Sequence, residues 1–209
     1  MTTYDVTGSV PTALLVIDVQ ESFRARDSWR AISNPRIADD VNLLVTAARA
    51  RGEQVIWVVH AEPGTGGVFD PVSGYVRLIE GLEPAAGEPV LTKVVHNAFT
   101  TTNLQLLLTA AGIRRVVVCG IRTEQCCETT ARLASDLGYE VVFVTEATAT
   151  MPVPHRDLPE TASLEEILAD PRTLSSQQII ARTEYALAGR FATIATVDEL
   201  TAAPVPAAG

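Results

Sequence analysis

The chain has 209 residues, 47% hydrophobic and 20% charged, which is ordinary for a globular protein and long enough for one α/β domain with a sizeable core. Its formal net charge of -9 argues against nucleic acid and anionic membranes as partners, because both are themselves negative. We therefore expect a small-molecule partner and a single domain over residues 1–209, with a core from about residue 11 to residue 200.

The start of the chain and its cysteines bear on the cellular compartment. The first ten residues lack the basic start and apolar centre of a signal peptide, and no apolar run approaches the roughly 18 residues of a membrane span. The 3 cysteines include no Cys-x-x-Cys pair, which disfavours a disulfide framework and a zinc or redox site. We expect a cytoplasmic protein with reduced thiols.

The first half of the chain begins with a pattern of strand, helix and strand. The apolar run Ala13 to Asp18 predicts a buried strand that ends on a carboxylate, which is as often a turn former as a functional group. An amphipathic helix capped by Asn34 follows and stops at Gly52. The next strand, Gln54 to Val59, brings His60 to its end.

Two further strands carry chemically active side chains at their ends. The strand of residues 89–93 ends on Lys93, and a leucine-rich helix follows and ends near Gly112. The strand of residues 116–120 leads into a helix for which Thr123 is the expected N-cap. Cys126 then falls in the first helical turn, where free N–H groups and the helix dipole favour a thiolate. Alternatively, Cys126 and its neighbour Cys127 are small apolar residues that pack this turn.

The last third contains a fifth strand, residues 140–144, a helix from about residue 176 to 189 and a sixth strand, residues 191–195. Between them, residues 145–173 form a long segment with several prolines and acidic residues. Segments of this length are usually functional or disordered, so a lid and a surface insertion are both open. The tail, residues 201–209, has the composition of a disordered end.

Strands that alternate with helices predict a doubly wound, Rossmann-like α/β fold: a six-stranded parallel sheet with helices on both faces. Ligands of such sheets bind at the carboxyl ends of the strands, so Asp18, Lys93 and Cys126 should meet at one edge. A carboxylate, an ammonium group and a helix-capped thiol are the parts of a cysteine nucleophile with its own base. The carboxylate takes the thiol proton, and the lysine balances the charge.

The residues around these three positions closely resemble the isochorismatase-like cysteine hydrolases, which include nicotinamidases, N-carbamoylsarcosine amidases and ureidoacrylate amidases. The matching stretches are ALLVIDVQESF, LTKVVHNAFTTTNL and GIRTEQCCETTAR. The resemblance implies a catalytic triad of Asp18, Lys93 and Cys126, with Cys126 rather than Cys127 as the nucleophile. It also implies a cis peptide bond between Ile121 and Arg122, and an oxyanion hole formed by the backbone N–H groups of Arg122 and Cys126.

The resemblance further implies hydrolysis of a C–N bond in a small amide, ureide or carbamoyl compound through a thioester. Vinyl-ether hydrolysis and a catalytically silent binding role remain alternatives, although true isochorismatases commonly have glycine in place of the cysteine. Nicotinamidases carry an Asp-x-His metal motif, whereas this chain has His60, Ala61 and Glu62, so we expect no metal and no cofactor. Family members are commonly homodimers or homotetramers, and we expect the same here.

Six residues near these motifs are candidates for substrate contacts: Gln20, Phe23, His60, Phe99, Arg122 and His155. The Arg122 side chain has two alternatives, a bidentate clamp on a substrate carboxylate or a salt bridge at a subunit contact. His155 lies in the segment Met151 to Thr173, which leaves the sheet at the edge expected to hold the pocket. We expect this segment to shape specificity.

Overall fold

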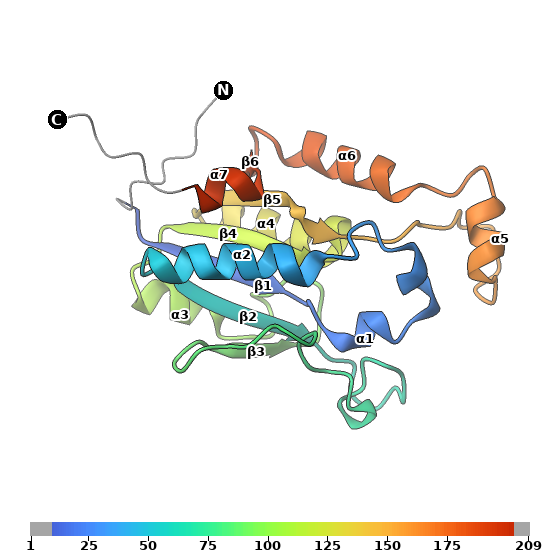
Figure 1. Ribbon diagram of the computed structural model, residues 1–209, viewed down its shortest axis with the longest axis horizontal. Helices are drawn as coiled ribbons and strands as arrows, with labels where there is room; N and C mark the ends of the chain where they lie inside the picture. Colours follow the sequence, from blue (N-terminus) through green and yellow to red (C-terminus); the bar gives the residue numbers. More distant parts are fainter. Residues whose placement is uncertain (1–9, 203–209) are drawn as a thin grey trace.

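The computed structural model describes residues 10–202, which form one parallel sheet with helices on both of its faces, as predicted (Figure 1). The six strands lie in the order β3-β2-β1-β4-β5-β6. Their bounds are β1 Thr12–Ile17, β2 Gln54–His60, β3 Val90–Lys93, β4 Arg115–Ile121, β5 Glu140–Ala149 and β6 Thr193–Ala195. The order reverses between β1 and β4, and a doubly wound sheet binds its ligand at such a reversal.

The helices divide between the two faces because each one buries a single apolar stripe. On one face, α2 (Ile37–Ala50) and α7 (Val197–Thr201) pack through side chains such as Val41 and Leu200. On the other face lie α3 (Leu104–Ala110), α4 (Glu128–Asp136) and the end of α6 (Ser176–Leu187). The central strands are buried on both sides, which explains their continuous apolar sequences.

Two predicted helix starts are wrong. Asn34 precedes α2 by three residues, and its Oδ1 accepts a hydrogen bond from the N–H of Arg36, so it closes a turn before the helix. After β4 the chain forms a π-helical turn, Thr123–Cys127, with Arg122 at the N-cap. Thr123 does not cap this turn, because its buried hydroxyl donates to Thr148 Oγ1 at 2.8 Å instead.

The segment after the predicted fifth strand is more ordered than its composition indicates. Strand β5 continues to Ala149, and its pairing with β4 skips several residues between Phe143 and Thr148. Residues 152–174 then form an arm that carries α5 (Leu164–Ala169) and is closed at its base by the antiparallel bridge of Val153 with Leu174. The arm extends beyond the carboxyl-terminal edge of the sheet in Figure 1.

Several short elements are absent from the sequence prediction, although the capping box of Thr196 and Glu199 marks the start of one of them, α7. They are α1 (Glu21–Arg24), two 3₁₀ turns at Asp27–Ala31 and Pro71–Ser73, and α7. The sixth strand is shorter than predicted and spans Thr193–Ala195 only. Of the tail expected to be disordered, Thr201 ends α7, while residues 203–209 lie outside the described part of the chain.

Candidate active site

Three side chains meet where the strand order reverses. Asp18 directly follows β1, Lys93 is the last residue of β3, and Cys126 lies in the π-helical turn after β4. Lys93 Nζ is 2.7 Å from Asp18 Oδ2 and 3.3 Å from Cys126 Sγ. Asp18 and Lys93 are fully buried, and Cys126 is 6% exposed. The structure therefore brings together the three residues singled out from the sequence.

The backbone around this cluster has two unusual conformations. Asp18 has a φ of 53°, a left-handed value that few residues other than glycine adopt. Gly120 has a φ of +130°, and a Cβ atom there would lie 1.9 Å from the carbonyl oxygen of Ile17. Only glycine lets β4 approach the end of β1 this closely, and this approach places the turn with Cys126 beside Asp18.

The peptide bond between Ile121 and Arg122 is cis, at the position expected from the resemblance. Within residues 10–202 the N–H of Arg122 donates to no backbone carbonyl, so it is free for another acceptor. Cys126 lies in a π-helical turn, and such turns are frequent at functional sites.

The side chain of Arg122 makes its described contacts within its own chain. Its guanidinium donates to Met151 O at 2.9 Å and to Thr150 Oγ1 at 3.2 Å, and it forms an ion pair with Glu124 at 3.1 Å. Thr150 Oγ1 also donates to Glu124 at 2.6 Å. Through Nε and Nη2, Arg122 thus ties the turn after β4 to the residues that follow β5.

The electrostatics of the cluster correct the expectation of an easily ionised thiol. Burial and the negative charge of Asp18 raise the pKa of the Cys126 thiol to about 12, although Lys93 opposes this change. Burial also raises the pKa of the Asp18 carboxyl, again against the effect of Lys93. Asp18 Oδ1 has no hydrogen-bond donor among the described residues, so the carboxyl can accept a proton there. The thiol is therefore protonated at rest, with its base beside it.

His60 lies directly against the cluster. Its Nδ1 is 3.3 Å from Lys93 Nζ, and its Nε2 is 3.4 Å from Glu62 Oε1. Gln20, predicted to contact substrate, instead fixes the backbone of His60: its Oε1 accepts from the His60 N–H at 2.7 Å, and its Nε2 donates to the His60 carbonyl at 3.0 Å. The amide also donates to Ser22 and is fully buried, so Gln20 is a structural residue.

The other three candidates for substrate contacts make their described contacts away from the cluster of Asp18, Lys93 and Cys126. Phe23 packs edge-on against Phe69 at 5.0 Å within the apolar core. Phe99 stacks on Tyr139 at 6.2 Å, on the face of the sheet that carries α3. His155 lies on the arm and faces Asp157 at 3.3 Å. None of the contacts described for these three side chains reaches Asp18, Lys93 or Cys126.

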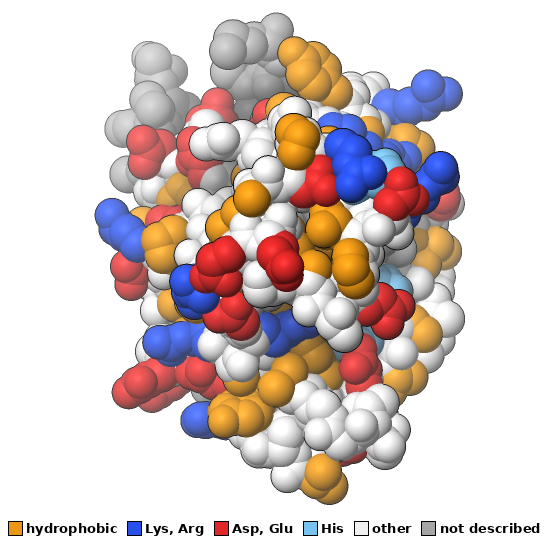
Figure 2. All heavy atoms as spheres, turned by 90° about the vertical axis from the view of Figure 1, so that its right-hand side faces the viewer, with side chains coloured by type: hydrophobic (Ala, Val, Ile, Leu, Met, Phe, Trp, Pro, Cys, Tyr) orange, Lys and Arg blue, Asp and Glu red, His pale blue; other side chains and the backbone are white. Residues whose placement is uncertain are grey.

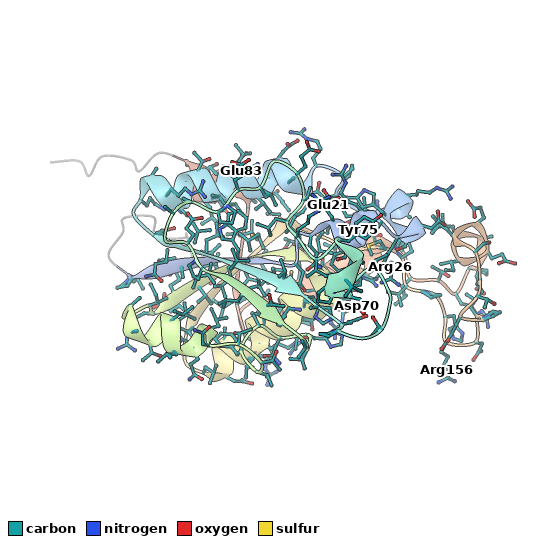
Figure 3. All side chains as sticks on the ribbon, turned by 90° about the horizontal axis from the view of Figure 1, so that it is seen from below. Glu21, Arg26, Asp70, Tyr75, Glu83 and Arg156 are labelled. Carbon is teal, nitrogen blue, oxygen red and sulfur yellow. The ribbon has the colours of Figure 1, made fainter. Side chains whose placement is uncertain are left out.

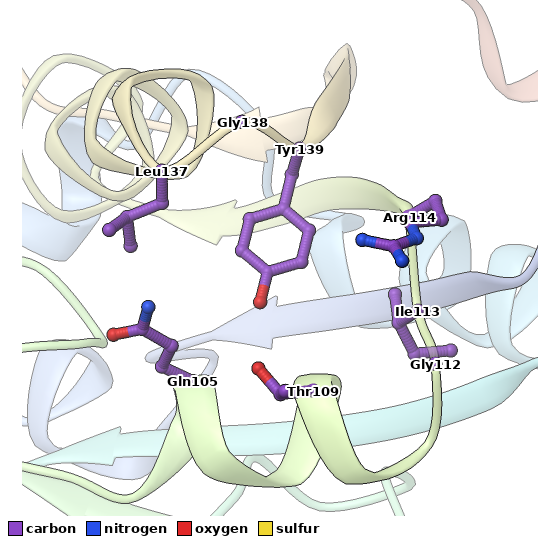
Figure 4. A pocket seen from close by; sticks show the side chains of 8 residues that line it. All are labelled: Gln105, Thr109, Gly112, Ile113, Arg114, Leu137, Gly138 and Tyr139. Carbon is purple, nitrogen blue, oxygen red and sulfur yellow. The ribbon is translucent and has the colours of Figure 1, made fainter.

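The surroundings of the carboxyl-terminal edge differ from those of the opposite edge. Figure 3 shows Asp70, Tyr75 and Arg26 gathered where the strands end, with Arg156 at the far side of the arm. Acidic, basic and hydrophobic side chains are interspersed over this face in Figure 2. The pocket in Figure 4, of about 180 Å³, lies at the opposite edge, where Gly112 and Gly138 precede β4 and β5, so it is unrelated to the cluster.

Sequence reasoning missed the partners that orient these residues. Glu62 follows His60 by two positions and enters the sequence prediction only as a possible metal ligand. Glu124 and Thr150 give no sequence signal, because their contact joins separate elements. Glu128 is buried at the start of α4 and binds Arg132, Arg182 and Thr183. The sequence signal for Glu128 is a charged residue at a position of the amphipathic helix that should be buried, because a buried charge needs partners.

Two negative observations apply to residues 10–202. No cluster of three or more histidine, cysteine, aspartate or glutamate side chains is arranged to hold a metal ion. No helix in this part of the chain is both long enough and apolar enough to span a membrane.

Comparison with known proteins identifies the family. The isochorismatase domain family matches residues 12–173. YrdC of Bacillus subtilis, an isochorismatase family protein, is 28% identical over 90% of this chain and 93% of its own length. A streptothricin hydrolase of Streptomyces noursei is 33% identical over 94% of this chain and 74% of its own. The ureidoacrylate amidohydrolase RutB of Klebsiella pneumoniae is 26% identical over 66% of this chain and 72% of its own.

Solved structures agree with these relatives. An isochorismatase from Pseudomonas putida has a TM-score of 0.76 and 30% identity over 90% of this chain and 88% of its own. A cysteine hydrolase from Pseudomonas syringae has a TM-score of 0.80 over 95% of this chain and 93% of its own, and at 23% identity it shows the fold alone. With the domain match covering most of its length, this chain belongs to the isochorismatase family of hydrolases.

Proposed function

We propose that this protein is a cysteine hydrolase that cleaves the C–N bond of a small amide, ureide or carbamoyl compound through a thioester. The observation that carries the proposal is the contact of Lys93 Nζ with both Asp18 and Cys126 in a buried site. A thiol with an adjacent carboxyl base and a fixed cation is suited to nucleophilic attack on a carbonyl carbon.

In the first half of the reaction Cys126 attacks the substrate. Asp18 takes the thiol proton as the sulfur bonds to the carbonyl carbon, which is necessary because the pKa of the resting thiol is about 12. The N–H groups of Arg122 and Cys126 hold the oxyanion of the tetrahedral intermediate. The C–N bond then breaks, and Asp18 returns its proton to the departing ammonia or amine.

In the second half water hydrolyses the thioester. Asp18, again ionised, takes a proton from the water while the water oxygen bonds to the carbonyl carbon of the thioester. The second tetrahedral intermediate breaks its C–S bond, the sulfur recovers the proton from Asp18, and the acid product leaves. The raised pKa of Asp18 favours proton transfer in both directions, because it brings the pKa of the carboxyl closer to the pKa values of the groups with which it exchanges protons.

The relatives support C–N chemistry, because they include a ureidoacrylate amidohydrolase. The isochorismatase from Pseudomonas putida supports the rival C–O chemistry by name. The buried Cys126 thiol, in contact with the lysine that also binds Asp18, favours the C–N chemistry, since attack by sulfur on a carbonyl carbon needs such a nucleophile.

The test combines a substrate panel with two cysteine variants. Small amides, ureides and carbamoyl compounds are screened for ammonia release, with isochorismate as the C–O substrate. We expect Cys126→Ala to reduce turnover by about 10³-fold or more, whereas Cys127→Ala retains most activity. A covalent acyl adduct on Cys126 in the intact mass would support the thioester. Loss of activity in the Cys127 variant alone, or turnover of isochorismate only, would overturn the proposal.

A further inference from the structure

We propose that His60 is a positioning residue for Lys93: its neutral imidazole accepts the third N–H of the lysine, and Glu62 fixes the tautomer that can do so. This inference rests on the proposed function and assigns His60 a role other than substrate contact. It follows from three contacts of one ammonium group and two of one imidazole.

The first step concerns the donors of Lys93. An ammonium group has three N–H donors and no acceptor. Lys93 Nζ has three neighbours: Asp18 Oδ2 at 2.7 Å, Cys126 Sγ at 3.3 Å and His60 Nδ1 at 3.3 Å. Because Lys93 is fully buried, a donor without a partner would be costly there. His60 therefore completes the set that holds the lysine between the base and the nucleophile.

The second step fixes the protonation of His60. Nδ1 faces a group that only donates, so it must be the acceptor, and Nε2 faces the carboxylate of Glu62 at 3.4 Å, so it carries the hydrogen. Burial and the positive charge of Lys93 lower the pKa of His60, which agrees with a neutral ring. Protonation at Nδ1 would turn an N–H toward the ammonium and displace the lysine.

The third step is that the imidazole is held in place on several sides. Gln20 binds both the N–H and the carbonyl of His60, which fixes its backbone at the end of β2. The ring of Phe69 meets the imidazole edge-on at 5.7 Å, and His96 stacks on it at 6.5 Å. The His60 side chain is therefore suited to orient Lys93, because its own conformation is already fixed by the surrounding residues.

The charged or titratable groups that face the His60 ring are Lys93, Glu62, Asp18 and His96. Lys93 lowers the pKa of His60, and Asp18 and Glu62 oppose this, with burial as the largest effect. The His60 ring therefore becomes protonated only at a pH below its usual pKa of 6.5. In the acid limb of kcat/KM, protonation of His60 then adds to protonation of Asp18.

The experiment compares His60→Leu, which removes the acceptor, with His60→Asn, whose Oδ1 takes the covalent position of Nδ1 and does not titrate. We expect His60→Leu to lower kcat by about tenfold with little change in KM, the cost of one unsatisfied buried donor. His60→Asn should recover most of this loss and show a shallower acid limb. Thr109→Asn, in the pocket at the opposite edge of the sheet, is the control and should behave as the unaltered protein.

Two readouts do not depend on turnover. The rate of Cys126 alkylation by iodoacetamide at fixed pH should fall in His60→Leu and recover in His60→Asn. The ¹⁵N chemical shifts of His60 in the unaltered protein should show hydrogen at Nε2. Hydrogen at Nδ1, equal kcat in all variants, or a change confined to KM without rescue by asparagine would overturn the inference. If the unaltered protein hydrolyses no amide, the proposed function fails, while alkylation and the tautomer still test the role of His60.

Discussion

Lys93 and Asp18 form a fully buried ion pair. Removal of one partner leaves a buried charge without compensation, and the free energy of unfolding then depends on the pH at which the remaining group titrates. In Lys93→Met the burial of Asp18 remains while the largest opposing effect, that of Lys93, is lost, so the pKa of its carboxyl rises further above the unfolded value of 3.8. Between these two values the folded state keeps the proton and the unfolded state loses it. The free energy of unfolding therefore falls as pH rises, by about 1.4 kcal/mol for each unit of pKa elevation.

Urea unfolding of Lys93→Met at several values between pH 4 and pH 7 measures this slope. The double variant Lys93→Met with Asp18→Asn should lack it, because the titrating group is gone. A Lys93→Met protein that gains stability relative to the double variant as pH rises would contradict the direction of the Asp18 shift.

At the scale of elements, Gly120 decides how closely β4 approaches β1. The Cβ of Gly120→Ala would lie 1.9 Å from a backbone oxygen that cannot move without its strand, so we expect a loss of about 4 kcal/mol or more, or no folding. Gly138→Ala is the control, because its φ of +89° is also left-handed but no atom lies within 4 Å. It should cost about 1 kcal/mol. Similar unfolding free energies for the two variants would contradict this account.

The arm of residues 152–174 is the element best placed to affect specificity. Its base is closed by the bridge between Val153 and Leu174, so residues 155–172 can be replaced by a short linker without separating the ends. We expect kcat/KM to change unequally between substrates, while alkylation of Cys126 stays nearly constant because the cluster is built on β1, β3 and the turn after β4. Unchanged kinetics across the panel would make the arm a surface feature only.

The elements that sequence predicts and those it misses differ in what specifies them. Strands β1 and β4 are buried on both sides, so their apolar runs are visible, and residues such as Asp18 and Lys93 follow from the strand ends. The contact of His60 with Lys93 depends instead on the register of β2 with β3, which pairs these two residues directly. The hydroxyl of Thr123 binds Thr148 because β5 continues past a bulge, and no local signal reveals this.

At the scale of the whole molecule, we propose a homodimer or homotetramer. Large hydrophobic side chains are exposed at several places, including Tyr185 on α6 at 89% and Leu106 on α3 at 67%. Exposed apolar side chains that gather into a contiguous patch are a common property of surfaces that join subunits. Light scattering after size exclusion should give about two or four times the monomer mass of 22.3 kDa. A mass of one chain over the whole concentration range would contradict the proposal.

Cys126 is almost completely buried and its thiol pKa is about 12, and both properties protect the enzyme's nucleophile against oxidants. Peroxide oxidises thiolates, and a protonated, enclosed thiol offers almost none. The resting protein should therefore keep its nucleophile in the presence of oxidants that inactivate hydrolases with preformed thiolates. Its sulfur becomes most vulnerable when a bound substrate promotes transfer of the thiol proton to Asp18.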